Sequence, residues 1–143
     1  MPLNDTVLTG PGAGRTVTHG QGSSTELKLV GEQTGGDWSV VEWRVRPGGE
    51  PPVHTHTRED EALYVIDGAI TVIVGDESID VEAGSYAALP KDVPHSFIVR
   101  GAEARLLVTL EPAGVEYFFV PRDDSDNDPA KFGLIINEAA QAA

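Results

Sequence analysis

Two of the chain's four histidines, His54 and His56, are separated by a single residue. Alternate side chains of an extended strand point to the same face, so their Cα atoms would lie about 7 Å apart and both imidazoles could bind one ion. A third histidine, His95, shares its parity with Phe97 and Val99 in the run HSFIVR, so it is expected to point to the apolar face of its strand. Neighbouring strands of a closed sheet can bring it to the same ion. The three imidazoles therefore predict a metal site.

Glu61 is the expected fourth ligand. It shares one strand face with Leu63 and Val65, which look like core residues, so its carboxylate is expected to point inward. Glu59 and Asp60 are expected in the preceding turn. A buried ionised carboxylate is costly unless a positive charge compensates it, and a divalent cation held by neutral imidazoles would do so. The predicted metal ligands are His54, His56, Glu61 and His95.

The ligand types also limit the ion. The chain has no cysteine, so thiolate ligands are excluded and the ion must be held by histidine, carboxylate or water. Three nitrogens and one oxygen leave one or two positions open on a metal that prefers five or six ligands, as catalysis requires. Fe, Mn, Ni, Co, Zn and Cu all accept such ligands, so we expect one divalent transition metal ion of open identity.

Short strands must position these ligands. In residues 37–46, Val41, Trp43 and Val45 alternate with charged residues, which is the period of a half-buried strand. Similar runs occupy residues 61–67, 69–74, 78–82, 95–100 and 105–111. In the third of these runs, Ile79 and Val81 are the apolar positions. Turn-forming residues separate the runs, and many short strands at close spacing predict an all-β sandwich or barrel.

We expect a single domain over residues 1–143, with a loose N-terminal arm at 1–24, a barrel at 25–120, and a linker with a C-terminal helix at 121–143. The length and the 40% hydrophobic content suit one core. Asp128 is a suitable N-cap and Pro129 a suitable first helical residue, and apolar residues follow at helical spacing. These features predict a short amphipathic helix from residue 129.

The charge of the chain limits its partners. Lys and Arg number 10 against 23 Asp and Glu, which gives a net charge of −13 and would repel phosphate backbones and anionic lipid surfaces. We therefore expect no nucleic-acid or membrane partner. The first twenty residues lack the pattern of a secretory signal, and no run of eighteen apolar residues occurs. A soluble, cytoplasmic protein is predicted.

The spacing of the candidate ligands resembles the two motifs of the cupins. The first motif has Gly, five residues, His-x-His, three or four residues, Glu, six residues and Gly, and this chain has Gly48, His54, His56, Glu61 and Gly68. The second has Gly, five residues, Pro, one residue, Gly, two residues, His, three residues and Asn, where this chain has Gly84, Pro90, Asp92, His95 and Val99. Asp92 replaces a glycine but tolerates turn conformations, and Val99 replaces a polar residue without removing a ligand.

The resemblance implies an all-β cupin fold, a jelly-roll antiparallel β-barrel of two packed sheets with the metal in its mouth, and commonly a homodimer. The stretches PPVHTHTREDEALYVIDG and EPAGVEYFFV look most like the small single-domain cupins grouped with quercetin dioxygenases. That similarity implies a metal-dependent dioxygenase, an oxidoreductase acting on a small aromatic or polyketide-like hydroxy-ketone, with Glu61 as the catalytic base.

Two alternatives stay open. The same ion and base could support isomerisation or cyclisation without oxygen, or the barrel could bind a metal and a small molecule without catalysis. The mostly apolar inward faces favour an aromatic or polyketide substrate over a sugar. Phe97, Leu63 and Trp43 are the candidate pocket residues, whereas His19 lies in a polar arm without a partner at ligand spacing and is expected to be solvated.

Overall fold

The computed structural model describes residue 3 and residues 5–138, and strands make up most of its regular structure. The strands are β1 (Thr16–Thr18), β2 (Ser24–Leu29), β3 (Ser39–Val45), β4 (Val53–His56), β5 (Asp60–Val74), β6 (Glu77–Glu82), β7 (Tyr86–Leu89), β8 (His95–Glu111) and β9 (Leu134–Glu138). The short helices are η1 (Gly20–Gly22), α1 (Gly31–Thr34), α2 (Glu116–Phe119), η2 (Asp124–Asp126) and η3 (Pro129–Phe132). In this part of the chain, none of the helices has both the length and the apolar character needed to cross a lipid bilayer.

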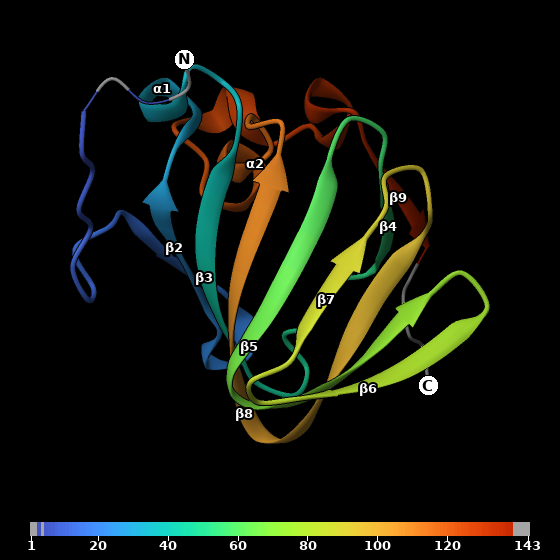
Figure 1. Ribbon diagram of the computed structural model, residues 1–143. Coiled ribbons are helices and arrows are strands. Elements are labelled where there is room, and N and C mark those ends of the chain that lie inside the picture. Colours follow the sequence, from blue (N-terminus) through green and yellow to red (C-terminus); the bar gives the residue numbers. More distant parts are fainter. Residues whose placement is uncertain (1–2, 4, 139–143) are drawn as a thin grey trace.

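All strand pairs are antiparallel, and the two longest strands organise the sheet. β5 and β8 pair along their whole lengths, while the main strand order is β1-β2-β3-β8-β4-β9 and β6 and β7 both pair with β5. Residues 104–110 of β8 pair with β3, whereas His95 at its other end pairs with His54 of β4. Figure 1 shows both long strands turning sharply at the lower end of the view, so each contributes to two parts of the sheet. The predicted all-β jelly roll is confirmed, although the described strands leave the sheet open instead of closing it into a barrel.

The turn in β5 depends on Gly68. Its φ is +81°, in the left-handed region that L residues adopt only at a cost, and a Cβ atom there would lie 2.4 Å from the carbonyl oxygen of Glu103. The register between β5 and β8 shifts at this point. Asp92 also adopts a left-handed conformation, with φ of +68°, which agrees with the prediction that aspartate keeps the turn of the second motif.

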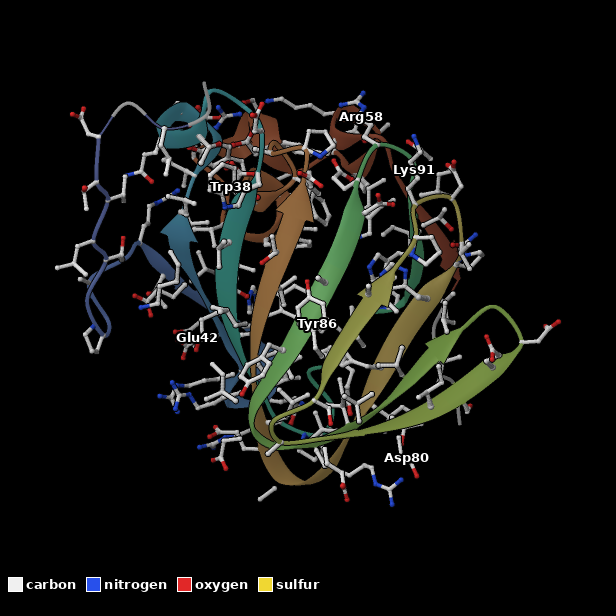
Figure 2. All side chains as sticks on the ribbon, viewed as in Figure 1. Trp38, Glu42, Arg58, Asp80, Tyr86 and Lys91 are labelled. Atoms are coloured by element: carbon white, nitrogen blue, oxygen red, sulfur yellow. The ribbon has the colours of Figure 1, made fainter. Side chains whose placement is uncertain are left out.

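The core lies between the inward faces of the curved sheet. Val41, Trp43 and Val45 of β3 are buried, and Leu106, Val108 and Leu110 of β8 are fully buried. This matches the predicted alternation in both strands. In β6, Val81 is buried but Ile79 is 44% exposed, because β6 pairs only with β5 and lies at the margin of the sheet. On the outer face, Tyr86 of β7 is 68% exposed (Figure 2).

The predicted C-terminal helix is wrong beyond its first turn. Asp128 does cap a helix, accepting a hydrogen bond from the backbone N–H of Ala130, and Pro129 begins it. That helix is the single turn η3, because Gly133 follows it in a left-handed conformation with φ of +68°. The chain then extends as β9 and pairs with β4, so residues 134–138 satisfy the edge of β4. The final residues of the predicted helix, 139–143, lie outside the described part of the chain.

Candidate metal centre

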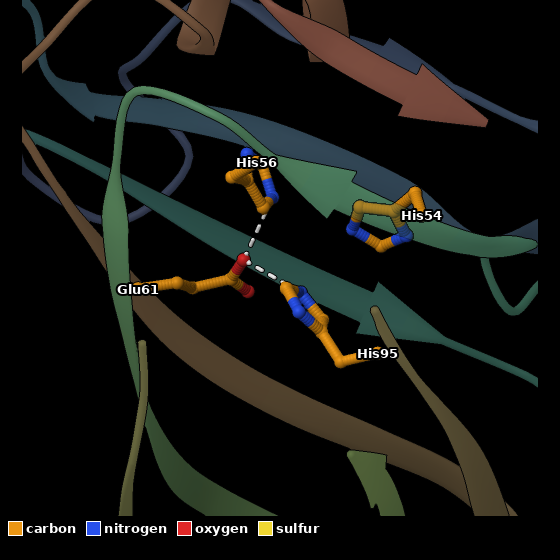
Figure 3. A group of neighbouring side chains, drawn as sticks. All are labelled: His54, His56, Glu61 and His95. Carbon is orange, nitrogen blue, oxygen red and sulfur yellow. Dashed lines mark hydrogen bonds and ion pairs between the residues drawn. The ribbon is translucent and has the colours of Figure 1, made fainter. Parts of the chain in front are cut away.

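The structure brings the four predicted ligands together from three strands (Figure 3). His54 and His56 lie on β4, Glu61 lies near the start of β5, and His95 begins β8. The side chains of His54 and His95 lie on the same face of the sheet because these residues are direct cross-strand partners. All four side chains are buried, and one ligand atom from each lies within 4.8 Å of the others.

Glu61 joins two of the imidazoles. Its Oε1 atom lies 3.0 Å from Nε2 of His56 and 3.2 Å from Nε2 of His95. His54 completes the group, with its ring centroid 4.5 Å from that of His95 and 5.0 Å from that of His56. Both close contacts of Glu61 therefore involve the Nε2 atoms, which marks these atoms as the ones that face the centre.

The outer nitrogens of all three imidazoles have acceptors. Nδ1 of His54 donates to the carbonyl oxygen of Pro52 at 2.7 Å, and Nδ1 of His95 donates to that of Val93 at 3.2 Å. Nδ1 of His56 lies 3.1 Å from Oε1 of Glu59. Because carbonyl and carboxylate oxygens only accept, each Nδ1 that donates to one of these oxygens carries a proton. In the metal-free protein, Nε2 of His56 and Nε2 of His95 face the carboxylate of Glu61. A bound cation would replace that contact, and each Nε2 would then offer it a lone pair, as metal-ligating histidines do.

The pKa values of the clustered residues shift in different directions. Burial, reinforced by the neighbouring His95, lowers the pKa of His54 to about 4. Burial would also lower the pKa of His56, but the carboxylates of Glu59 and Glu61 outweigh it and raise that pKa to about 9. Burial would raise the pKa of Glu61, yet the two facing imidazoles outweigh it and hold that pKa well below its usual range. Glu61 is thus an ionised carboxylate at neutral pH.

These residues fit a divalent cation. Although Nε2 of His56 lies 3.0 Å from Glu61, it is a buried nitrogen with no hydrogen-bond partner among the described residues. Buried polar atoms are rarely left unpaired, and an ion among the Nε2 atoms would satisfy this one. Three nitrogens and one carboxylate oxygen are a common donor set for first-row transition metals, and these four residues could hold one.

A pocket of about 330 Å³ borders the cluster at His54, whereas Glu61 lines a separate pocket with Trp38 and Tyr86. The pocket at His54 has a mainly apolar lining, and His54 forms part of its wall together with Trp43, Phe118 and Phe119. Its volume falls in the range of small-molecule sites. Residues of the N-terminal part of the chain also line it, including His19 and Thr25, whose side chains lie 2.8 Å apart.

The predicted pocket residues occupy different places. Trp43 lines the pocket, whereas Phe97 lies in the core with its ring centroid 5.8 Å from that of Trp43. Leu63 is also a core residue and does not line this pocket. His19 is exposed, as expected, but it also borders the pocket, and no spacing to the other histidines could have signalled this position.

Glu59 lies in the turn between β4 and β5, as expected, but it is only 3% exposed and contacts His56 from behind. The strand parity that oriented Glu61 does not apply to Glu59, which precedes the first residue of β5. Only its position three residues after a candidate ligand could have drawn attention to it.

Comparison with known families supports this geometry. Residues 41–110 match the family model of the cupin domain, a segment that contains all four clustered residues. The protein carries a cupin domain. A curated relative, quercetin 2,3-dioxygenase of Bacillus subtilis (strain 168), is 26% identical over an alignment of 118 residues, and the match covers 79% of this chain and 35% of the relative. The chain therefore spans about a third of the length of that dioxygenase.

Solved structures show the same cupin fold. KdgF from Halomonas sp. superposes with a TM-score of 0.69 at 16% identity, covering 78% of this chain and 98% of KdgF. An RmlC-like cupin from Shewanella frigidimarina NCIMB 400 superposes with a TM-score of 0.67 at 20% identity, covering 82% of this chain and 99% of that protein. At these identities the likeness establishes the fold alone.

Metal binding is expected to release protons. At pH 7.5, binding of Co²⁺ to the metal-free protein should release about one proton per ion, because His56 is protonated before binding and must be neutral to act as a ligand. His54 is already neutral at this pH. Isothermal titration calorimetry in buffers of different ionisation enthalpy measures the release, which should decline above pH 9. Binding without proton release at pH 7.5 would contradict the assigned state of His56.

Proposed function

We propose that this cupin is a metal-dependent oxidoreductase of the dioxygenase type, acting on a small aromatic or polyketide-like hydroxy-ketone. The observation that carries the proposal is the convergence of His54, His56, His95 and Glu61 beside an apolar pocket. The similarity to a quercetin dioxygenase supports the reaction class. The aromatic lining from Trp43, Phe118 and Phe119 supports a flat substrate.

The residues of the cluster would divide the work. His54, His56, His95 and Glu61 would hold one divalent transition metal ion, which would supply Lewis acidity that favours the deprotonated form of a bound hydroxy-ketone. Glu61 is ionised and buried, so its carboxylate would accept the substrate's hydroxyl proton as the catalytic base. The apolar wall beside His54 would exclude water from the reacting group.

Oxygen consumption tests the proposal. Protein loaded separately with Fe, Mn, Co or Ni should take up oxygen with at least one member of a panel of flavonols. Glu61→Gln should lower kcat at least about 100-fold while metal content stays near that of the parent protein, because the amide cannot accept the proton. Glu111→Gln, which changes an exposed carboxylate on β8, is the matched control and should keep full turnover.

Assays in the presence of oxygen and under nitrogen distinguish a dioxygenase from an isomerase or cyclase. Absence of oxygen uptake with every metal and every flavonol would overturn the dioxygenase proposal. Products isomeric with the substrate that form under nitrogen would instead support metal-assisted isomerisation or cyclisation. If Glu61→Gln leaves the activity of the protein in cells unchanged, a non-catalytic binding role replaces both.

A second prediction tests the pocket. Ile136 on β9 pairs with His54, lines the pocket and is 43% exposed, so Ile136→Trp should narrow the approach to the cluster without disturbing the core. We expect kcat/KM to fall about tenfold or more while bound metal stays unchanged. Ile135→Trp is the control, because Ile135 is adjacent to Ile136 in the chain, is 51% exposed and does not line the pocket. Equal effects of the two substitutions would argue that substrate enters elsewhere.

A further inference from the structure

Glu59 is a buried carboxylate outside the four-residue cluster. It is 3% exposed, and its Oε1 atom lies 3.1 Å from Nδ1 of His56, whose side chain is 1% exposed. Among the ion pairs of the described residues, Glu59 contacts His56 and no lysine or arginine. A carboxylate in such surroundings is costly unless nearby positive charge compensates it.

The acceptor behind His56 differs from those behind the other two imidazoles. His54 and His95 donate to the neutral carbonyl oxygens of Pro52 and Val93, whereas the acceptor of His56 is an acidic side chain. Hydrogen bonds to ionised acceptors are stronger than neutral ones and make the imidazole a better ligand. The cluster is therefore asymmetric, with one histidine held by charge and two by the backbone.

Hydrogen bonds from Thr57 and Arg58, the two residues before Glu59, hold the turn that carries it. The backbone N–H of Thr57 donates to the carbonyl oxygen of Gly133 at 3.1 Å, and Nη1 of Arg58 donates to that of Lys131 at 3.1 Å. These bonds tie the turn to η3 and its connection to β9. The Arg58 side chain lies at the surface while Glu59 is turned inward, so the position of Glu59 is set by the surrounding fold.

We infer that Glu59 is a positioning residue, which holds the His56 ring with Nε2 toward the cation and supplies the second negative charge of the centre. Three neutral imidazoles contribute no charge, so Glu59 and Glu61 together balance a divalent ion. This balance favours a divalent ion over a monovalent one in a buried site. The inference rests on the metal site of the proposed function but does not depend on the reaction catalysed there.

The affinity for Co²⁺ tests the role of Glu59. Glu59→Gln keeps an acceptor oxygen for Nδ1 of His56 and loses the charge, whereas Glu59→Ala loses both. We expect Glu59→Gln to weaken Co²⁺ binding about 10-fold and Glu59→Ala about 100-fold, the range seen when partners of ligating histidines are removed. The visible spectrum of bound Co²⁺ should change more in Glu59→Ala than in Glu59→Gln, since only the former frees the ring.

Asp60→Asn is the matched control. Asp60 is the next residue, is exposed, and accepts a hydrogen bond from the backbone N–H of Lys91 without contacting the histidines. Its replacement should leave the Co²⁺ affinity within about threefold and the spectrum unchanged. If Glu59→Ala does not fold, Glu59→Gln alone decides the test.

The outcomes distinguish this inference from the proposed function. If the parent protein binds Co²⁺ and Glu59→Gln binds it with the same affinity and spectrum, the inference fails while the metal site stands. If Asp60→Asn weakens binding as much as Glu59→Gln, the effect is one of overall charge, and the positioning role is overturned. A parent protein that binds no Co²⁺ would overturn the metal site itself.

Discussion

The structure depends on how negative charge is compensated in the interior of the sheet. Glu61 is buried, and its oxygen lies within 3.2 Å of two imidazole nitrogens. Without a cation, His56 carries the compensating proton, which is why its pKa is raised to about 9. A divalent ion would replace that proton with a larger charge and satisfy the unpaired Nε2 of His56. The negative charge of the centre is thus compensated by the proton on His56 in the metal-free protein and would be compensated by the ion in the metal-bound protein.

The pairing of the strands brings the side chains of His54, His56, Glu61 and His95 together. β5 and β8 bend together, so the single strand β8 carries core residues against β3 at one end and presents His95 to β4 at the other. The pairing of β9 with β4 closes the pocket wall beside His54 and fixes the turn that carries Glu59. The strand pairing therefore places the four ligands together before any ion binds.

Strand parity predicted much of the fold and the position of the clustered residues, because alternation alone determines which face a side chain takes. Strand parity gave no orientation for Glu59, which lies just before β5. It also missed β9, which replaces a predicted helix, because Ile135 and Ile136 suit either period and only the open edge of β4 decides between them. His19 reaches the pocket through tertiary folding. The homodimer and the cytoplasmic location stay predictions.

Elemental analysis gives the most direct test that the four side chains hold a single ion. The protein and its His54→Ala, His56→Ala double variant would be purified in parallel, incubated with excess Co²⁺, freed of unbound metal by gel filtration and analysed by mass spectrometry. We predict one metal ion per chain in the protein and a trace in a double variant that remains folded by circular dichroism. Equal metal content in the two proteins, or none in either, would contradict the account.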